Sequence, residues 1–542
     1  MGQPVLQDQY LAARAYFICV IGMLFVESVI RLPARIRGLI HHDQPFIRNS
    51  TGHSRVVVVL HKLLTLPSPV PLLTSHHLAN WLRFGVLLGL NVLFGVNDNE
   101  YTTDFKLYGW LTIANGGLAL LMAARTNLFS LVAQIPSSVL LVYHRWIGIA
   151  TMVYATIHFA LNTQHYMATD QLATSFSNLR IQVGTMAWAA LVVLAIASAP
   201  IVRRRLFEVF YYTHALFFVF VVGALIHATK GPEFLLPGLL LWGCDRFLRL
   251  YYNFRSINTT SVQYHHGDVT KMKFEGMKPH HPGQIAWVQI PSVSFLNWHP
   301  FTIASAPGDK DATIAIRGLG GYTRKVGDIV QNDIFEGDAA QAGIQSKTGR
   351  LRMRLDGPYG LGRIFWGEQP LTVLVAGGIG ITPAISIATH LVRRAAFSDS
   401  AALMGKSWHI HILWVVKSIE STEWFADELR SLATVTADPA VPATLDISIH
   451  VTGSAGELPA PRDIESYAMS GHSKPYDGPG EVNMGRPDVL AWFEGIRRMN
   501  PCLDAMVSVC GPTKLIHDVR RAASKVSSAK STFYVEEEVF EF

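Results

Sequence analysis

Apolar runs long enough to cross a lipid bilayer dominate the chain before about residue 255, and they constrain the fold more than any other feature. A transmembrane helix needs about 20 predominantly apolar residues. Charges at or near the ends of the first two runs (Arg14, Glu27 and Arg83) make these the weakest candidates. The sequence predicts seven spans, at residues 11–30, 81–97, 107–124, 138–160, 183–202, 208–228 and 234–252. Only 16% of the residues are charged, compared with about 25% in soluble domains.

The distribution of Lys and Arg predicts how these spans are oriented. Cytoplasmic loops of membrane proteins carry an excess of basic residues. The loop at 162–180 has one basic residue, whereas Arg203, Arg204 and Arg205 follow the fifth span. We therefore expect the N-terminus outside and everything after about 255 in the cytoplasm. The same loops account for the net charge of +6, and no nucleic-acid-binding motif is present, so nucleic acid is not an expected partner.

After residue 255 the pattern changes to short β-rich segments separated by Gly and Pro. The runs AWVQI, ATIAIR and RLRMRL predict a small antiparallel barrel up to about 365. Buried strands then alternate with helices, which predicts a parallel α/β sheet. Residues 453–487 are rich in Gly, Pro and Ser, and we interpret them as a surface insertion. The cysteines are too scattered for a disulfide framework or a zinc site; they are Cys19, Cys244, Cys502 and Cys510.

Four histidines lie inside two of the predicted spans. His144 and His158 are 14 residues apart, and His214 and His227 are 13 residues apart. On parallel helices these separations correspond to rises of about 21 and 20 Å, so His144 pairs in depth with His214 and His158 with His227. Each pair could hold one haem iron from its two faces. Thirteen residues miss the starting helix face by about 140°, so the second helix either presents its histidines on different sides or is locally irregular.

HRWIG at 144–148, the two histidine separations, and HPFT at 299–302 resemble the ferric reductase and NADPH oxidase superfamily. The resemblance extends over residues 75–542. It implies an α-helical transmembrane haem-binding bundle followed by a ferredoxin-reductase-like module. The expected parts are an N-terminal helix and basic loop (1–75), a six-helix haem domain (76–255), an FAD-binding β-barrel (256–365) and an NADPH-binding α/β domain (366–542). The implied cofactors are FAD, NADPH and two b-type haems.

The resemblance also assigns residues to the flavin. Phe301 and Thr302 would lie beside the isoalloxazine ring and His299 near the flavin phosphates, with Pro300 stiffening the end of the strand. In the next motif, Arg317 can neutralise a pyrophosphate that the adjacent glycines allow to come close. The further members of this motif that we assign to the cofactor are Gly321, Tyr322 and Thr323.

Nicotinamide binding is expected at two turns that follow strands. The first, AGGIGITP, opens a helix as a phosphate-binding turn does, and it contains Gly377, Gly378, Gly380, Thr382 and Pro383. The second is Cys510-Gly511-Pro512, in which Cys510 is either close to the nicotinamide or simply a buried thiol. The terminal aromatic, Phe542, would stack on the flavin, unless the acidic end of the chain is a frayed tail. Lys417, after the HILWVV strand, is a candidate to bind the 2′-phosphate of NADPH.

The implied activity is transmembrane metalloreduction: electrons from cytosolic NADPH reach ferric or cupric chelates on the opposite side of the plasma membrane, with a metal permease or oxidase downstream. The alternative is an NADPH oxidase that reduces dioxygen to superoxide. In such oxidases a His lies one turn beyond the outer haem ligand, whereas this chain has Asn162 there, which favours the reductase. Arg145 could pair with a haem propionate or be an ordinary interfacial arginine.

Overall fold

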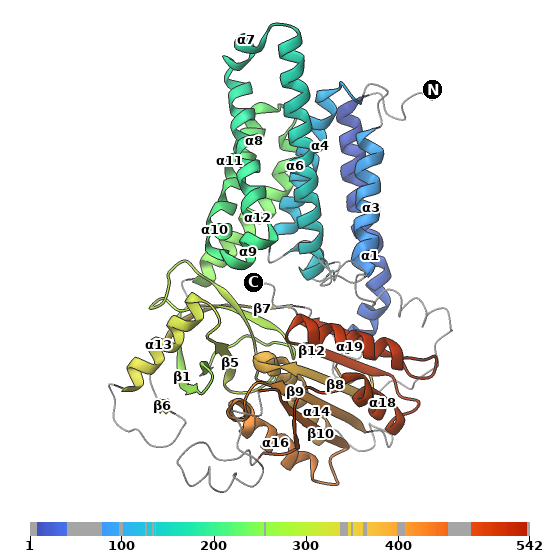
Figure 1. Ribbon diagram of the computed structural model, residues 1–542, viewed down its shortest axis with the longest axis vertical. Helices are drawn as coiled ribbons and strands as arrows, with labels where there is room; N and C mark the ends of the chain where they lie inside the picture. Colours follow the sequence, from blue (N-terminus) through green and yellow to red (C-terminus); the bar gives the residue numbers. More distant parts are fainter. Residues whose placement is uncertain are drawn as a thin grey trace. The chain divides into compact units, whose positions relative to one another are not determined.

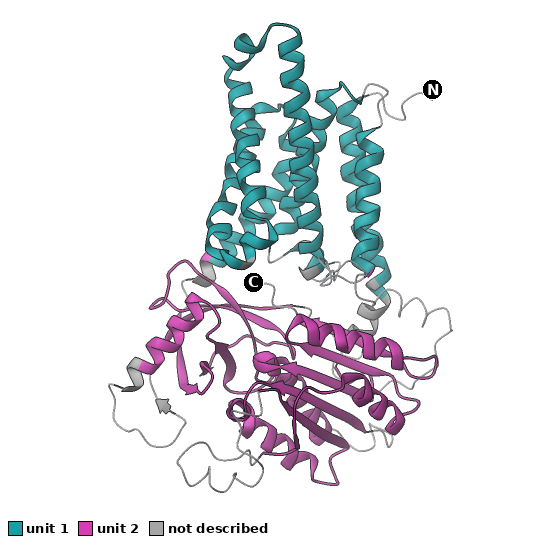
Figure 2. Ribbon diagram, in the orientation of Figure 1, with its two compact units in different colours: residues 1–36, 79–249, 540–542 teal, residues 37–78, 250–539 magenta. Residues whose placement is uncertain are grey.

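The computed structural model describes residues 8–40, 78–96, 101–124, 127–132, 135, 137–253, 256–335, 345–347, 351–360, 366–397, 407–453 and 478–538. Their contacts divide the chain into two compact units (Figure 2). The first contains Met1–Ile36 and Ala79–Arg249, and the second contains Leu250–Val539. The boundary at 249/250 lies a few residues before the one we expect from the sequence.

The described elements of the first unit are all helices (Figure 1). Its long helices begin and end as follows: α1 Gln9–Ile40, α3 Leu78–Gly95, α4 Phe105–Ala123, α6 Ser137–Ala168, α8 Leu179–Ala197, α11 Phe217–His227 and α12 Pro232–Asn253. The shorter ones are α5 Leu128–Leu131, α7 Leu172–Phe176, α9 Pro200–Arg205, α10 Phe207–Thr213 and the 3₁₀ segment η2 His214–Leu216.

All seven predicted spans fall on helices, but only five helices within the described residues are long and apolar enough to cross a membrane. The two exceptions are the predicted spans 107–124 and 234–252. In α4 the apolar run is interrupted by Asn115, Gly116 and Gly117, and most of the helix is buried inside the unit. In α12 a buried ion pair joins Asp245 to Arg249. Both helices therefore combine polar groups with burial against other helices.

Two of the three charges that weaken the first two predicted spans, Glu27 and Arg83, neutralise each other in the structure. Arg83 on α3 donates to Glu27 on α1 with an N–O distance of 2.5 Å, and Tyr143 on α6 donates to the same carboxylate at 3.0 Å. A charged group in an apolar environment is tolerated when it is paired in this way. The pair therefore joins three helices and explains how both charges fit within apolar segments.

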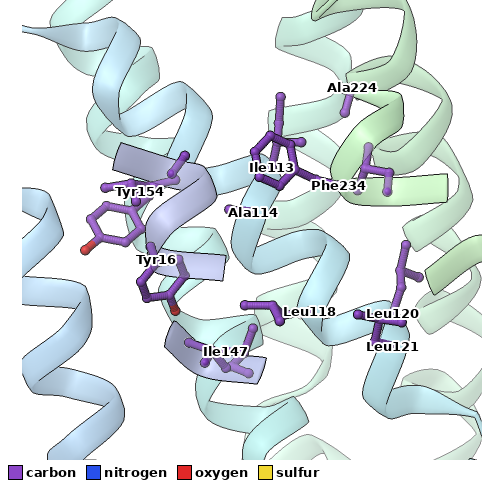
Figure 3. Packing of buried hydrophobic residues seen from close by; sticks show 14 of the residues in the cluster. Tyr16, Ile113, Ala114, Leu118, Leu120, Leu121, Ile147, Tyr154, Ala224 and Phe234 are labelled. Carbon is purple, nitrogen blue, oxygen red and sulfur yellow. The ribbon is translucent and has the colours of Figure 1, made fainter. Parts of the chain in front are cut away.

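A second polar cluster joins α1 to α3 and α4 deep in the helical unit. Tyr16 donates to Asn115 Oδ1 at 2.7 Å, and Asn91 Nδ2 donates to the Tyr16 hydroxyl at 3.0 Å. Tyr154 on α6 donates to the carbonyl of Asn91 at 2.7 Å. Figure 3 shows Tyr16 and Tyr154 among the buried apolar side chains that surround them. We call Tyr16, Asn91, Asn115 and Tyr154 the polar cluster.

The second unit begins with an antiparallel sheet in the order β4-β3-β7-β1-β2-β5, with β6 paired to β1. A bridge between Ile303 and Ile314 links the two ends of this order, which closes the sheet into the predicted barrel. Its strands are β1 Ser256–His265, β2 Val269–Phe274, β3 Ile285–Gln289, β4 His299–Thr302, β5 Ala312–Arg317, β6 Gln345–Lys347 and β7 Arg352–Tyr359. The barrel also carries helix α13, Gly321–Phe335, which the sequence reading missed.

The remainder of the unit is a parallel sheet in the order β11-β10-β9-β8-β12-β13, covered by helices (Figure 1). The strands are β8 Leu371–Gly377, β9 Trp408–Val416, β10 Ala443–Val451, β11 Glu481–Met484, β12 Ala505–Cys510 and β13 Phe533–Glu538. The helices are η3 Gly378–Gly380, α14 Ile381–Phe397, η4 Ile419–Phe425, α16 Ala426–Thr436, α18 Val489–Met499 and α19 Thr513–Val526. Strand β11 corrects the end of our interpretation of 453–487 as an insertion, because Glu481–Met484 extend the sheet beside β10. Residues 454–477 lie outside the described residues, so the rest of that interpretation stays a prediction.

Candidate functional site

The four span histidines form two pairs in the helical unit. The ring centres of His144 and His214 lie 6.1 Å apart, and those of His158 and His227 also lie 6.1 Å apart. Two imidazoles on one metal ion have metal–nitrogen bonds of about 2 Å, so their ring centres are separated by about 6 Å. Both pairs therefore have the separation that a haem iron with two axial histidines requires.

In three of these four rings a hydrogen bond occupies Nδ1, which leaves Nε2 free to bind a metal. Nδ1 of His144 donates to the carbonyl of Ala119 at 3.0 Å, and Nδ1 of His158 donates to that of Phe105 at 2.6 Å. Nδ1 of His227 donates to the carbonyl of Arg180 at 2.8 Å. A metal-bound imidazole typically has its other nitrogen held by such a carbonyl, which fixes the tautomer. Nδ1 of His214 is buried and has no partner among the described residues.

The 3₁₀ segment at His214 explains how separations of 14 and 13 residues give equal ring distances. Residues His214–Leu216 form η2, between α10 and α11. A 3₁₀ residue rises about 0.5 Å more than an α-helical one, so three residues add about 1.5 Å. This lengthens the rise from His214 to His227 to about 21 Å, the rise of fourteen α-helical residues. The structure therefore has a local irregularity, whose three residues add about 60° of turn and remove part of the 140° difference in helix face.

A cavity of about 340 Å³ lies beside His158 and His227. We call it the outer cavity. Glycines bring α4 and α8 close to these histidines, since a Cβ atom at Gly109 would lie 3.0 Å from His158 and one at Gly184 would lie 2.5 Å from His227. Phe159 and Trp188 stack in its wall with ring centres 4.0 Å apart. Asn162 also lines it, and its side-chain oxygen is buried without a partner in the described structure. Arg145, beside His144, is half-buried.

In the second unit, HPFT forms strand β4, which pairs with β3. Pro300 and Thr302 are buried, whereas His299 and Phe301 are half-buried. The His299 ring lies 4.1 Å from the ring of Tyr322, and its Nε2 is buried without a partner among the described atoms. Burial lowers the pKa of His299 to about 4, so the ring is neutral at pH 7. It can therefore donate one hydrogen bond to a phosphate but brings no positive charge.

The motif after β5 opens helix α13 at Gly321. The Thr323 hydroxyl oxygen accepts hydrogen bonds from the backbone amides of Leu319 and Gly320, at 3.0 and 2.9 Å. The Tyr322 hydroxyl accepts one from the backbone amide of Ile290, and burial raises its pKa to about 12. Thr323 thus shapes the turn, and the first amides of α13 point out of the N-terminal end of the helix, where a phosphate binds readily.

Arg317 reaches from the barrel to the nucleotide turn. Its guanidinium lies 5.6 Å from the centre of the Trp424 ring, and one of its nitrogens lies 3.2 Å from where a Cβ at Gly378 would be. Gly378 has a φ of +57°, a conformation that favours glycine. The turn leads directly into α14, whose first turn contains buried Thr382 and Pro383. Arg317 therefore stands where it could neutralise a phosphate at this turn.

Gly377 and Gly380 allow the two nucleotide turns to touch. A Cβ at Gly377 would lie 2.6 Å from Pro512 and 3.2 Å from Gly511, and one at Gly380 would lie 2.4 Å from the carbonyl of Cys510. These contacts leave no room for a larger residue at either position. They place the ends of β8 and β12 side by side at the carboxyl edge of the sheet, which is the usual ligand-binding edge of α/β folds.

Glu538 is a candidate site residue that the sequence reading missed. It pairs with Cys510 across β12 and β13, and the Thr302 hydroxyl donates to its carboxyl group at 3.5 Å. The carboxyl group is enclosed, although the residue keeps some exposed surface, and burial raises its pKa to about 8. Burial, and secondly the nearby Glu538, also raise the pKa of the Cys510 thiol. A protonated carboxylic acid and a neutral thiol therefore lie at the end of the HPFT strand.

The described structure does not place two predicted residues in this geometry. Phe542 lies outside the described residues, so its stacking role stays a prediction. Lys417 follows β9 with an exposed side chain, and its backbone carbonyl accepts the amide of Gly453 at 2.8 Å. No described contact ties its ammonium group to the nucleotide turn. The only sequence signal for Glu538 was the acidic run at the end of the chain, which by itself does not single out one carboxylate.

Three family descriptions match successive parts of the chain. "Ferric reductase like transmembrane component" matches residues 108–225, "FAD-binding domain" matches 254–362, and "Ferric reductase NAD binding domain" matches 371–524. These matches cover three of the four span histidines (His144, His158 and His214), HPFT and both nucleotide turns. The chain therefore has an FAD-binding and a nicotinamide-dinucleotide-binding domain after a multi-pass membrane region.

Relatives include both oxidases and reductases. NADPH oxidase 3 of Homo sapiens is 26% identical over 403 residues, which are 65% of this chain and 68% of that protein. The probable ferric reduction oxidase 1 of Arabidopsis thaliana is 30% identical over 262 residues, 46% of this chain and 35% of that protein. Among solved structures, the FAD/NAD-binding domain of a Vibrio cholerae nitric oxide dioxygenase aligns with 52% of this chain and 99% of that chain, at 14% identity and a TM-score of 0.31.

A membrane region with paired histidines, an FAD-binding barrel and a dinucleotide-binding sheet thus occur in one chain. The protein is a transmembrane flavocytochrome-type oxidoreductase that takes electrons from NAD(P)H through FAD, and it belongs to the ferric reductase and NADPH oxidase superfamily.

Proposed function

We propose that this protein is a transmembrane metalloreductase, which uses cytosolic NADPH to reduce ferric or cupric chelates on the opposite side of the plasma membrane. The observation that carries the proposal is the two-layer arrangement of histidines, with equal ring separations of 6.1 Å. His144 and His214 would hold an inner haem, and His158 and His227 an outer one. Bound FAD would divide a hydride into single electrons, and the bound haems would carry single electrons across the bilayer.

Backbone carbonyls and side chains together set the conditions for this transfer. The carbonyls of Ala119, Phe105 and Arg180 hold three of the four imidazoles in one tautomer. The two nucleotide turns are in close contact at Gly380 and Cys510, and the hydrogen bond from Thr302 to Glu538 joins this edge of the sheet to the end of the HPFT strand. Protonated Glu538 supplies a hydrogen-bond donor at that position without adding a charge at neutral pH.

Reduction of a metal rather than dioxygen is favoured by Asn162, one turn beyond His158 in the wall of the outer cavity. An amide cannot supply a proton as an imidazole can at neutral pH. Reduction of dioxygen to superoxide is the second candidate, because NADPH oxidase 3 matches the chain over 403 residues. As part of the metalloreductase function, we also propose that a metal permease or oxidase uses the reduced ion.

An assay with intact cells separates the two candidates. Cells that express the full chain receive ferric–EDTA or cupric chelates that do not cross the membrane, with and without superoxide dismutase. A metalloreductase reduces the chelate at a rate that dismutase does not change. A signal that dismutase abolishes would identify the oxidase. Haem analysis of the purified protein should give two haems per chain, and NADPH and NADH compared as donors test the proposed coenzyme preference.

A further inference from the structure

Trp424 lies on η4, is only 2% exposed, and contacts the barrel through three separate groups. Its indole Nε1 donates to the carbonyl of His266 at 2.8 Å, and its backbone carbonyl accepts a hydrogen bond from the Lys271 ammonium at 3.1 Å. The guanidinium of Arg317 lies over its ring, 5.6 Å from the ring centre. This one residue therefore ties the nucleotide-binding part of the unit to the β1–β2 turn, to β2 and to the end of β5.

The β1–β2 turn is shaped to receive the indole. Gly267 has a φ of +80°, and a Cβ atom there would lie 3.1 Å from Cζ2 of Trp424. Asp268 follows with a φ of +59°, which residues other than glycine seldom adopt. The carbonyl of Asp268 accepts the backbone amide of Gly318, the first residue after β5, at 2.8 Å. The turn that holds the indole therefore also holds the start of the motif assigned to the flavin phosphates.

Trp424 is also linked to the nucleotide turn. The ring centres of Trp414 and Trp424 lie 6.4 Å apart, and Nε1 of Trp414 donates to the carbonyl of Gly378 at 2.9 Å. Arg317, under the Trp424 ring, has one nitrogen 3.2 Å from where a Cβ of Gly378 would be. Trp424 thus contacts both the cation of the barrel that faces this turn and the aromatic residue that holds the turn.

The reaction that both parts serve depends on their relative position. Hydride transfer moves two electrons and one hydrogen from C4 of the nicotinamide of NADPH to N5 of the flavin, so NADPH is oxidised and FAD is reduced. The reacting atoms must approach to about 3–3.5 Å, and a misplacement of about 1 Å can slow a reaction about a hundredfold.

We propose that Trp424 is a positioning residue for hydride transfer. It fixes the barrel against the parallel sheet and keeps Arg317 beside the nucleotide turn. This inference goes beyond the proposed metalloreductase function, because the step from NADPH to FAD is the same whether a metal or dioxygen finally takes the electrons.

The first test is Trp424→Leu in the full-length holoprotein, mixed with NADPH under anaerobic conditions in a stopped-flow instrument. The rate constant of flavin reduction at saturating NADPH should fall at least about tenfold, because the two rings are no longer held in place. The Kd of NADP⁺, measured by calorimetry, should rise about tenfold, because Arg317 loses its aromatic partner. The long-wavelength absorbance of stacked nicotinamide and flavin should weaken, while the FAD content stays as in the wild type.

Two further variants divide the contact into its parts. Trp424→Phe keeps a ring for Arg317 but cannot donate to His266, so the Kd of NADP⁺ should stay close to that of the wild type while flavin reduction still slows. Gly267→Ala disturbs the same contact from the barrel, since its Cβ would lie 3.1 Å from the indole. Flavin reduction should slow in this variant as well. Adding Gly267→Ala to Trp424→Leu should cause little further change, because residues in contact are not additive.

The matched control is Trp408→Leu. Trp408 is 0% exposed, and its Nε1 donates to the carbonyl of Gly367 at 3.1 Å. It begins β9, at the opposite end of the strand from the nucleotide turn. Loss of this buried indole should lower the melting temperature about as much as Trp424→Leu does. Flavin reduction and NADP⁺ binding should match the wild type.

The outcomes distinguish positioning from simple packing. If Trp424→Leu lowers the melting temperature but its flavin is reduced as fast as in the wild type, Trp424 only fills space and the inference is wrong. Equal slowing in Trp408→Leu would also overturn it. Where Trp424→Leu retains no FAD, wild-type rates in both Trp424→Phe and Gly267→Ala would refute it. None of these results depends on the final acceptor, so the metalloreductase proposal is tested separately.

Discussion

Replacing Gly184 by Ala tests the assignment of the outer histidine pair without altering any histidine. An added Cβ would lie 2.5 Å from Nδ1 and 2.9 Å from Cε1 of His227. Ordinary non-bonded contacts are about 3.5 Å, so the ring must move by about 1 Å. A metal–nitrogen bond tolerates only about 0.2 Å. The hydrogen bond from His227 to Arg180, now 2.8 Å, would also be disturbed.

The chain offers a graded series for this experiment. At Gly109 the added Cβ would lie 3.0 Å from the His158 ring, which requires a shift of about 0.5 Å. At Gly148, on the same helix as His158, nothing lies within 4 Å, so Gly148→Ala is the matched control. Overpacking of this kind costs about 1–3 kcal/mol, which should be too little to unfold the membrane region.

The assay is the reduced-minus-oxidised absorbance and the haem content of the purified variants. We expect two haems per chain for Gly148→Ala, one for Gly184→Ala, and an intermediate value for Gly109→Ala. Full haem content with an unchanged spectrum in Gly184→Ala would refute the assignment of His227 as a haem ligand. Loss of both haems in Gly148→Ala would show that the series reports general instability.

Three further predictions concern the second unit. Burial raises the pKa of Glu538 to about 8, so the rate of NADPH-driven flavin reduction should decrease as pH rises through about 8. Glu538→Gln should remove this pH dependence. Identical stopped-flow pH profiles for the wild type and Glu538→Gln would contradict the prediction. Gly380→Ala would place a Cβ 2.4 Å from the Cys510 carbonyl, so KM for NADPH should rise at least tenfold. The control is Gly495→Ala, which should match the wild type because a Cβ there has no neighbour within 4 Å. Lys271 on β2 pairs with Glu428 on α16 at 2.5 Å. Lys271→Met should therefore destabilise the unit by about 1–3 kcal/mol, and adding Glu428→Gln should recover part of this loss. Equal melting temperatures for the wild type and Lys271→Met in thermal denaturation would contradict the prediction.

The raised pKa of Glu538 also has a defined effect on stability. The folded protein keeps a proton that the unfolded chain releases above the usual carboxyl pKa of 4.5. Stability falls with pH wherever the folded state binds more protons. The contribution of this group therefore declines as pH rises from about 4.5 to about 8, and levels off above the folded pKa.

The sequence predicts those features that depend on local pattern. The strands around HILWVV and AMVSVC follow from continuous apolar runs, and the Gly-rich turn at 377–380 follows from its place between a strand and a helix. The histidine pairs follow from two separations that differ by one residue. None of these requires knowledge of a tertiary contact.

Other features depend on contacts that one sequence does not reveal. Helix α13 lies within a region interpreted as barrel, although the spacing of its buried Tyr322, Val326 and Val330 is helical and could have indicated it. Strand β11 is short and gains its place only by pairing with β10. Glu538 is notable only because it lies opposite Cys510 and Thr302.

The polar cluster affects how the helices of the membrane region are inserted into the bilayer during synthesis. Tyr16 on α1 finds its acceptor in Asn115 on α4, 99 residues later in the chain. During synthesis α1 therefore enters the bilayer with an unsatisfied hydroxyl, which it must keep until α3 and α4 have been inserted. A bare polar group in hydrocarbon is costly, so the first helix should remain beside the insertion machinery, or a chaperone within the membrane, over that interval. Pulse-chase crosslinking from α1 would show a prolonged contact that Tyr16→Phe shortens.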